Sequence, residues 1–274
     1  MKDKPLISEG IDAFYSEISD EDRYTKGLGP LELERNKLFF KSCIAAPGSI
    51  IIDVGGGTGV YAEWLAGLGH HVHLVDPVRK HVRKALRKAA ASKHSFSCSL
   101  GEARDLDFPD NFADMVILHG PLYHLQSRKE RLKAIKEAKR VCKKNGIIVG
   151  IAINYASYTL AGLVHGLIHD PGFLDMCKGH LATGIHHPPS NDKQRFLAEA
   201  YFHRPDELLA EFESLQLRDL ELKAVEGLTW LDKHYFRTNA DPVRKKAMTE
   251  LLRLTENDLS LISLSPHMVI SGRK

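Results

Sequence analysis

The stretch Ile51–Asp76 constrains the fold of this chain more than any other part. A mostly apolar run at residues 51–54 leads into the glycine-rich segment Gly55–Gly59, and a second apolar run at 72–75 ends in Asp76. This pattern predicts a strand, a glycine turn, a helix and a second strand. Glycines let the backbone turn sharply and let a cofactor lie against main-chain N–H groups. The acid after the second strand is placed to bind a ribose, so the stretch predicts an adenosine-containing cofactor.

Strand and helix patterns alternate from residue 50 to residue 152. Such alternation predicts a parallel sheet with helices on both faces and right-handed crossovers. Ligands of such sheets bind at the carboxyl ends of the strands, where this chain carries Asp53, Asp76, Glu102 and His119. The predicted strands are 50–54, 72–76, 96–100, 114–118 and 146–152, and the predicted helices are 59–68, 78–92 and 128–143.

Helical patterns precede this core and interrupt its end. Residues 8–42 are predicted to be helical, and their charged side chains, including Glu32 and Arg35, are interpreted as a solvated surface unless this layer covers the cofactor pocket. Strands are predicted at 219–224 and 267–272, with a helical insertion between them. We therefore expect one structural domain with four parts: an N-terminal helical layer (1–48), the cofactor-binding core (49–152), a cap or lid (153–203) and a C-terminal completion of the core (204–274).

Length and composition restrict the class of protein. The 274 residues suit one elaborated domain, and 38 basic against 35 acidic residues leave a net charge of +3, too small to indicate nucleic-acid binding. The four cysteines form no C-x-x-C pair, which favours a reducing compartment. The N-terminus is polar, and no stretch reaches the roughly 18 apolar residues of a membrane span. We expect a cytoplasmic protein without a membrane partner; the oligomeric state is not predicted.

The glycine turn by itself does not choose the cofactor. Residues 57–62 can be fitted to the dinucleotide pattern G-x-G-x-x-[GA], and Asp76 lies near the expected spacing. Counted from the strand end, however, Gly55-x-Gly57 is followed by Val60, where that pattern requires a third glycine. Asp53 also precedes the turn, and an acid beside a pyrophosphate is electrostatically unfavourable. A cofactor that carries positive charge suits this turn better.

Four separated segments resemble the class I, Rossmann-like S-adenosylmethionine-dependent methyltransferases. Residues 53–59 resemble the first motif of that family, Asp76 its ribose-binding acid, residues 101–110 its adenine-binding segment and 114–118 its fourth-strand motif. All four follow consecutive predicted strands in the family's order. The resemblance covers residues 50–152 and implies an α/β fold with a seven-stranded, mostly parallel methyltransferase sheet, to which the N-terminal layer and the caps are added.

The resemblance also implies how S-adenosylmethionine is held. Asp53 is expected to favour its ammonium group, Asp76 to bind the ribose hydroxyls, and Pro77 to pack beside the adenine. The carbonyl of Leu118 is expected to help hold the methionine end. The full set of expected cofactor residues is Asp53, Gly55, Gly57, Gly59, Asp76, Pro77, Glu102, Ala103, Leu118 and His119.

Methyl transfer from a sulfonium is an in-line displacement, and a base is needed only if the nucleophile must first lose a proton. Histidine titrates near neutral pH, and a tyrosine ring can stabilise a sulfonium through its π face. Tyr155 and Tyr201, in the cap, are the predicted substrate-binding residues. The predicted catalytic residues are Tyr123, His124 and His203, with His119 close to the expected methyl group.

Two further patterns are given no function. His165 and His169 have i, i+4 spacing on a predicted helix, but no H-E-x-x-H motif accompanies them, so no metal site is predicted. The basic residues of 79–88 follow the second strand, and such a stripe is usually the solvated face of a helix.

These observations predict an enzyme that transfers the methyl group of S-adenosylmethionine to a small-molecule acceptor, with S-adenosylhomocysteine as the other product. A small acceptor is favoured because the added segments are helical caps with aromatic and histidine side chains. Two alternatives remain. One is intramolecular cyclisation or cleavage of S-adenosylmethionine to methylthioadenosine, and the other is an NAD(P)-dependent oxidoreductase.

Overall fold

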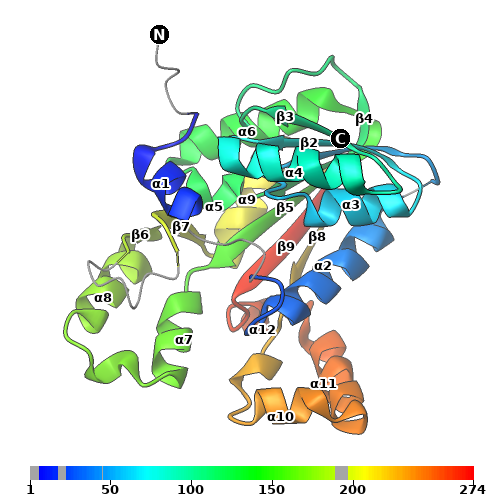
Figure 1. Ribbon diagram of the computed structural model, residues 1–274. Helices are drawn as coiled ribbons and strands as arrows, with labels where there is room; N and C mark the ends of the chain where they lie inside the picture. The colour runs from blue at the N-terminus through cyan, green and yellow to red at the C-terminus, as the bar shows by residue number, and fades with distance from the viewer. Residues whose placement is uncertain (1–5, 18–22, 45, 189–196) are drawn as a thin grey trace.

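A computed structural model describes residues 6–17, 23–44, 46–188 and 197–274. Its centre is a twisted sheet in the order β3-β2-β1-β4-β5, and β9 pairs with β5 and with β8 (Figure 1). The first five strands are parallel, whereas β9 is antiparallel to both of its neighbours. The strands are β1 (Ile50–Val54), β2 (His71–Asp76), β3 (Ser97–Leu100), β4 (Ala113–His119), β5 (Cys142–Asn154), β8 (Arg218–Ala224) and β9 (His267–Arg273).

These seven strands form the predicted sheet, so the predicted fold class is confirmed. Two further strands were not predicted: β7 (Ala200–His203) pairs in parallel with the end of β5, and the short β6 (Ile185–His186) pairs with β7. Because β9 occupies the other edge of Ile153, β7 extends the sheet on the β4 side, beyond the last residue of β4. The end of the predicted cap is therefore part of the main sheet.

The two faces of the sheet are covered by different helices, because successive strand residues point to opposite faces. Ile51 packs in a core with side chains of α2, α3 and α4, whereas Ile52 packs in a core with side chains of α6 and α9. Figure 1 shows these two helical layers around the sheet. The helices are α2 (Gly29–Cys43), α3 (Val60–Gly67), α4 (Arg79–Ala91), α6 (Arg128–Val141) and α9 (Pro205–Ser214).

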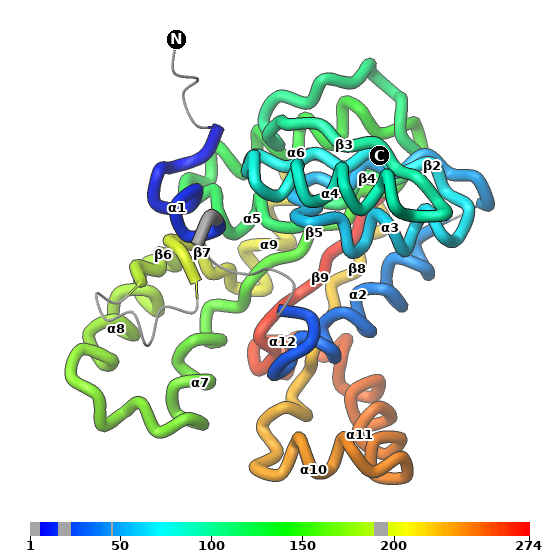
Figure 2. The backbone as a smooth tube through the Cα atoms, viewed as in Figure 1, coloured from blue at the N-terminus to red at the C-terminus, as the bar shows by residue number. Residues whose placement is uncertain are grey.

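Most of the remaining helices contribute little to these two cores, although Leu122 of α5 and Ile262 of α12 are buried in the core that contains Ile52. In Figures 1 and 2 the segments that carry α7–α8 and α10–α11 project from the body of the protein on the same side. Among the described residues, no helix is both long and apolar enough to cross a membrane. These helices are α1 (Glu9–Glu17), α5 (Pro121–His124), α7 (Ser157–Val164), η1 (Leu167–His169), α8 (Phe173–Thr183), η3 (Thr229–Leu231), α10 (Tyr235–Ala240), α11 (Pro242–Thr255) and α12 (Leu259–Ile262).

One predicted helix is wrong. α7 ends at Val164, and Gly166, with a φ of +74°, turns the chain before the short helix η1. A left-handed residue ends the α-helical hydrogen-bond pattern. His165 and His169 therefore do not share a helix, and both are exposed.

Candidate cofactor and acceptor site

A cavity of about 460 Å³ lies at the carboxyl ends of β1, β2 and β4, as expected for an α/β sheet. Residues 54–58 of the glycine turn line it, and Ile11 and Tyr15 of α1 line it from the N-terminal layer. Residues of four other segments contribute to the lining, 76–78, 102–104, 119–121 and 123–126, together with Arg23, Tyr24 and Tyr61. Segments of the N-terminal layer and of the core thus meet at one site.

The glycine turn needs its glycines for two reasons. Gly55 and Gly57 have φ values of +78° and +57°, which favour residues without a Cβ. A Cβ at Gly55 would also lie 2.1 Å from the carbonyl oxygen of His119. Gly59, with a φ of +83°, precedes α3 and packs on Phe96, and it is not among the residues that line the cavity.

Asp53 lies beneath this turn and is fully buried. A Cβ at Gly56 would lie 2.6 Å from its Oδ2. Neither carboxylate oxygen has a hydrogen-bond partner among the described residues. Burial, and then the nearby Asp76, raise the pKa of Asp53 to about 7. An acid held in this way is stabilised by any positive charge that approaches the turn.

Asp76 joins the glycine turn to the end of β2. Its Oδ2 accepts a hydrogen bond from the N–H of Gly57 at 2.9 Å, and its Oδ1 accepts one from the N–H of Val78 at 2.9 Å. Nδ1 of His81 lies 3.1 Å from the same Oδ1. The carboxylate lines the cavity and also fixes the shape of the turn.

Of the five other expected cofactor residues, four line the cavity. Pro77, Glu102 and Ala103 line the cavity, and Glu102 accepts hydrogen bonds from the backbone and side chain of Arg104, both at 2.8 Å. His119 also lines it, whereas the buried Leu118 does not.

A charged pair that the sequence did not reveal lies behind His119. Nη2 of Arg23 donates to Oε1 of Glu32 at 2.6 Å, and Nε2 of His119 lies 3.7 Å from the same oxygen. Glu32 is only 4% exposed, so its interpretation as a solvated surface residue was wrong. Burial alone would raise the pKa of Glu32, but Arg23 and His267 outweigh it and hold that pKa well below its usual range. Burial lowers the pKa of His119, which favours a neutral imidazole.

At the opposite wall, the phenol of Tyr15 lies 2.8 Å from Nε2 of His124. Burial lowers the pKa of His124 to about 4, so at neutral pH the imidazole carries no charge and shares a neutral hydrogen bond with the phenol. Tyr123 also lines the cavity. Tyr15 was not predicted, because nothing in the sequence of α1 indicates that it covers this site.

Three predicted site residues lie elsewhere among the described residues. His203 is fully buried, with Nε2 3.5 Å from Oε2 of Glu211. The Arg131 guanidinium lies 3.7 Å above the ring of Tyr201, and that of Arg204 lies 4.3 Å above the ring of Tyr155. None of these three predicted residues is among those that line the cavity.

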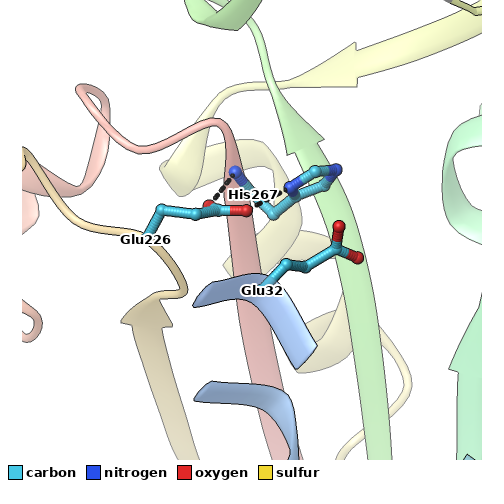
Figure 3. Close-up of side chains that lie close together, drawn as sticks. All are labelled: Glu32, Glu226 and His267. Atoms are coloured by element: carbon cyan, nitrogen blue, oxygen red, sulfur yellow. Dashed lines mark hydrogen bonds and ion pairs between the residues drawn. The ribbon is translucent and has the colours of Figure 1, made fainter. Parts of the chain in front are cut away.

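A second polar cluster adjoins the cavity. Ligand-type atoms of Glu32, Glu226 and His267 all lie within 4.8 Å of one another (Figure 3), the only such group of three found among the described residues. Nδ1 of His267 donates to Oε1 of Glu226 at 2.7 Å, and Arg23 pairs with Glu32. Both carboxylates thus have a basic side chain of the protein beside them.

The chain was compared with known proteins. Residues 52–150 match a methyltransferase domain family, and curated proteins give no match. A S-adenosylmethionine-dependent methyltransferase from Methanosarcina mazei is similar in structure, with 17% identity and a TM-score of 0.59 over 86% of this chain and 96% of that one. A methyltransferase from Haloferax volcanii, in complex with the Trm112 methyltransferase activator, has 17% identity and a TM-score of 0.58 over 97% of this chain and 98% of that one.

The [4+2]-cyclase SpnF is also similar, with 18% identity and a TM-score of 0.53 over 89% of this chain and 81% of that one. At identities of 17–18%, structural similarity shows only that the fold is shared. The matched domain family indicates the reaction, which is methyl transfer. That domain covers the glycine turn, Asp76 and the adjoining strand ends that line the cavity. Residues 52–150 are therefore a methyltransferase domain, and the chain has the fold of S-adenosylmethionine-dependent methyltransferases, with S-adenosylmethionine as its cofactor.

Proposed function

We propose that this enzyme methylates a small molecule. One observation carries the proposal: the cavity at the strand ends continues past the glycine turn to Tyr123 and His124 and is covered by Ile11 and Tyr15 of α1. A volume of about 460 Å³ lies within the range of small-molecule sites. A covered cavity of this kind suits a compact acceptor better than a segment of a macromolecule.

We assign the cofactor to the part of the cavity next to the glycine turn. Its ribose and adenine lie toward Asp76, Pro77 and the segment 102–104, and its methionine lies toward Gly55 and His119. The buried Asp53 favours this orientation, because the ammonium and sulfonium groups of the cofactor bring positive charge close to an acid that has no other partner among the described residues. Leu118 and Gly59, which are not among the residues that line the cavity, are assigned no direct side-chain contact with the cofactor.

The acceptor then lies against Tyr123, His124 and Tyr15. Holding the acceptor atom, the methyl carbon and the sulfur in line and away from water is the main contribution of such a site. His124 orients the phenol of Tyr15 through the hydrogen bond between them. His119, neutral and backed by Glu32, is the group we assign to accept a proton when the acceptor has to lose one. His203, Tyr155 and Tyr201 have no assigned role in this proposal.

A non-methylating reaction of S-adenosylmethionine is the second candidate, since a protein named a [4+2]-cyclase shares the fold. The test is mass spectrometry of the enzyme incubated with methyl-labelled S-adenosylmethionine, with and without a small-metabolite extract. We expect S-adenosylhomocysteine and one labelled product only when the extract is present. Methylthioadenosine formed without the extract would instead support cyclisation or cleavage, and labelling of macromolecules alone would contradict a small acceptor.

A variant at Tyr15 tests whether the activity measured in this assay depends on the cavity. Tyr15→Phe removes the hydrogen bond to His124 but keeps the ring, and we expect product formation to fall by about tenfold with little change in cofactor affinity. Tyr158→Phe is the matched control, because Tyr158 packs in the α7–α8 cluster and is not among the residues that line the cavity. Equal activity of the two variants would remove Tyr15 from the acceptor site.

A further inference from the structure

Glu226 and His267 lie at the ligand-binding edge of the sheet. β8 and β5 are both antiparallel to β9 and are therefore parallel to each other. Glu226 follows the carboxyl end of β8, and His267 begins β9 opposite Ile153, near the carboxyl end of β5. Figure 3 shows these two side chains pointing toward each other, with the carboxylate of Glu32 from α2 beside the imidazole. The cluster is thus placed at the same edge as the cavity, but on the far side of β4.

The contacts within the cluster are short and specific. Glu226 is 1% exposed, and it accepts hydrogen bonds from Nδ1 of His267 at 2.7 Å, from the N–H of His267 at 2.9 Å and from Oγ of Ser265 at 3.0 Å. These contacts fix the imidazole on its Nδ1 side. Because the ligand-type atoms of Glu32 lie within 4.8 Å of those of both partners, the imidazole lies close to two carboxylates.

The charges alternate along this cluster as far as the cavity. With His267 protonated, the order is Glu226 negative, His267 positive, Glu32 negative and Arg23 positive, so the buried charges cancel. Glu226, His267 and Glu32 are not among the residues that line the cavity, whereas Arg23 is. The series therefore ends on a cation at the cavity wall, and the group that would continue the alternation is an anion.

S-adenosylmethionine carries one anionic group, the carboxylate of its methionine part. Arg23 and Tyr24 line the cavity together with Tyr61 and His119, on the side of the glycine turn where we assign the methionine. Tyr61 packs against the rings of both Tyr24 and His119, with centroids 5.7 and 5.3 Å apart. The residues of this wall are distant in sequence from segment 102–104, where we assign the adenine. Arg23 provides a guanidinium there, which is suited to a carboxylate.

We propose that Glu226 and His267 are positioning residues that act through Glu32 to hold Arg23 at the cavity wall, where its guanidinium binds the carboxylate of S-adenosylmethionine. This inference rests on the cofactor and not on the identity of the acceptor. Glu226 and His267 do not touch the cofactor; they fix the carboxylate that orients Arg23.

The support that this cluster gives to Arg23 depends on pH, because His267 loses its positive charge when it is deprotonated. The charged and titratable groups around His267 are Glu226, Glu32, Arg23 and His119. Burial alone would lower the pKa of His267, but Glu226 and Glu32 outweigh it and raise that pKa. The support from the imidazolium is thus complete at low pH and is lost as the pH rises through this raised pKa. Cofactor affinity should fall over the same range.

The test is isothermal titration with two ligands, S-adenosylmethionine and methylthioadenosine, which lacks the amino-acid part. We expect Arg23→Met, Glu226→Gln and His267→Gln each to weaken binding of S-adenosylmethionine by about tenfold, while methylthioadenosine binds within about twofold of the wild-type affinity. Glu226→Asp should restore part of the loss. Glu256→Gln is the matched control, because Glu256 pairs with Arg35 of α2 and is not among the residues that line the cavity.

Each other outcome overturns the proposal. Unchanged S-adenosylmethionine affinity in Arg23→Met would exclude Arg23 as the carboxylate ligand. A loss in Arg23→Met without a loss in Glu226→Gln would exclude the positioning role. Equal losses for both ligands, or a loss in Glu256→Gln as large as that in Glu226→Gln, would exclude a specific contact between Arg23 and the carboxylate of the cofactor. Weaker binding by the wild-type protein after EDTA treatment would show that a metal ion, and not His267, holds the carboxylates. None of these measurements needs an acceptor, so failure of the proposed function would appear separately.

Discussion

At the scale of single residues, Asp76 combines two tasks, because it holds the glycine turn and faces the cavity. We expect Asp76→Ala to weaken S-adenosylmethionine binding by at least about 1 kcal/mol, since hydrogen bonds to a charged partner are lost. Isothermal titration measures this. Asp175→Ala, which removes an exposed acid on α8, is the control and should leave the affinity unchanged. Unchanged affinity in Asp76→Ala would contradict a ribose contact.

Asp53 gives a prediction about pH. Its folded-state pKa of about 7 lies above its ordinary value of 3.8, so the folded protein keeps a proton that the unfolded chain releases between these values. Stability therefore falls as the pH rises through this window. Asp53→Asn removes the titration, and its free energy of unfolding relative to wild type should rise by at least about 1 kcal/mol between about pH 5 and pH 8. Urea unfolding at both pH values checks this; a constant difference would contradict it.

At the scale of elements, α6 and α9 are joined by a buried ion pair. Arg131 and Glu211 are each 1% exposed, and Nη2 of Arg131 donates to Oε1 of Glu211 at 2.7 Å. Arg131→Met leaves the Glu211 carboxylate without its partner, and we expect it to cost roughly 3–5 kcal/mol of unfolding free energy. Denaturant titration measures the loss.

Two further variants separate this charge effect from lost packing. Arg131→Met combined with Glu211→Leu should recover most of the stability, because no uncompensated charge then remains. Lys178→Met breaks an exposed pair with Asp175, and it should leave the free energy of unfolding almost unchanged. A double variant as unstable as Arg131→Met alone would show that packing, rather than charge, sets the cost.

α1 is held over the cavity by a small separate cluster, in which Ile11 and Phe14 pack on Ala198. Phe14→Ala removes about 3 kcal/mol of packing from this cluster, which is enough to release the helix. We expect hydrogen exchange in α1 to become faster and cofactor affinity to fall several-fold, with little change in the global stability. Leu163→Ala, at an exposed position of α7, is the control. A large global loss would show that α1 is part of the main core.

At the scale of the whole molecule, the cavity lies between the strand ends and the N-terminal layer. A ligand present at about 100 times its dissociation constant stabilises the folded state by roughly 2.7 kcal/mol. For a chain of this length we expect S-adenosylmethionine to raise the melting temperature by about 5–10 °C. Differential scanning fluorimetry measures the shift. NADPH is the comparison ligand and should give none; a larger shift with NADPH would favour an oxidoreductase.

The regular part of the fold was predictable because local pattern and tertiary role agree there. Each strand of the core is an apolar run between turn residues, and β1 and β2 match their predicted ranges to within a residue. The short strands β6 and β7 were not predictable in this way. They are two and four residues long, and β7 is a strand because the end of β5 extends beyond β4 and offers it a partner.

The candidate site likewise has one part that was predictable from the sequence and one part that was not. The sequence by itself determined the glycine turn, Asp76 and the segment 102–104, because their function depends on backbone shape and on positions directly after strands. Only the tertiary structure decided that Tyr15 and Arg23 line the cavity, that Glu32 is buried, and that His203 is not among the lining residues. These outcomes depend on contacts between segments distant in the chain, and no local pattern specifies which charged or aromatic side chains will face each other across them.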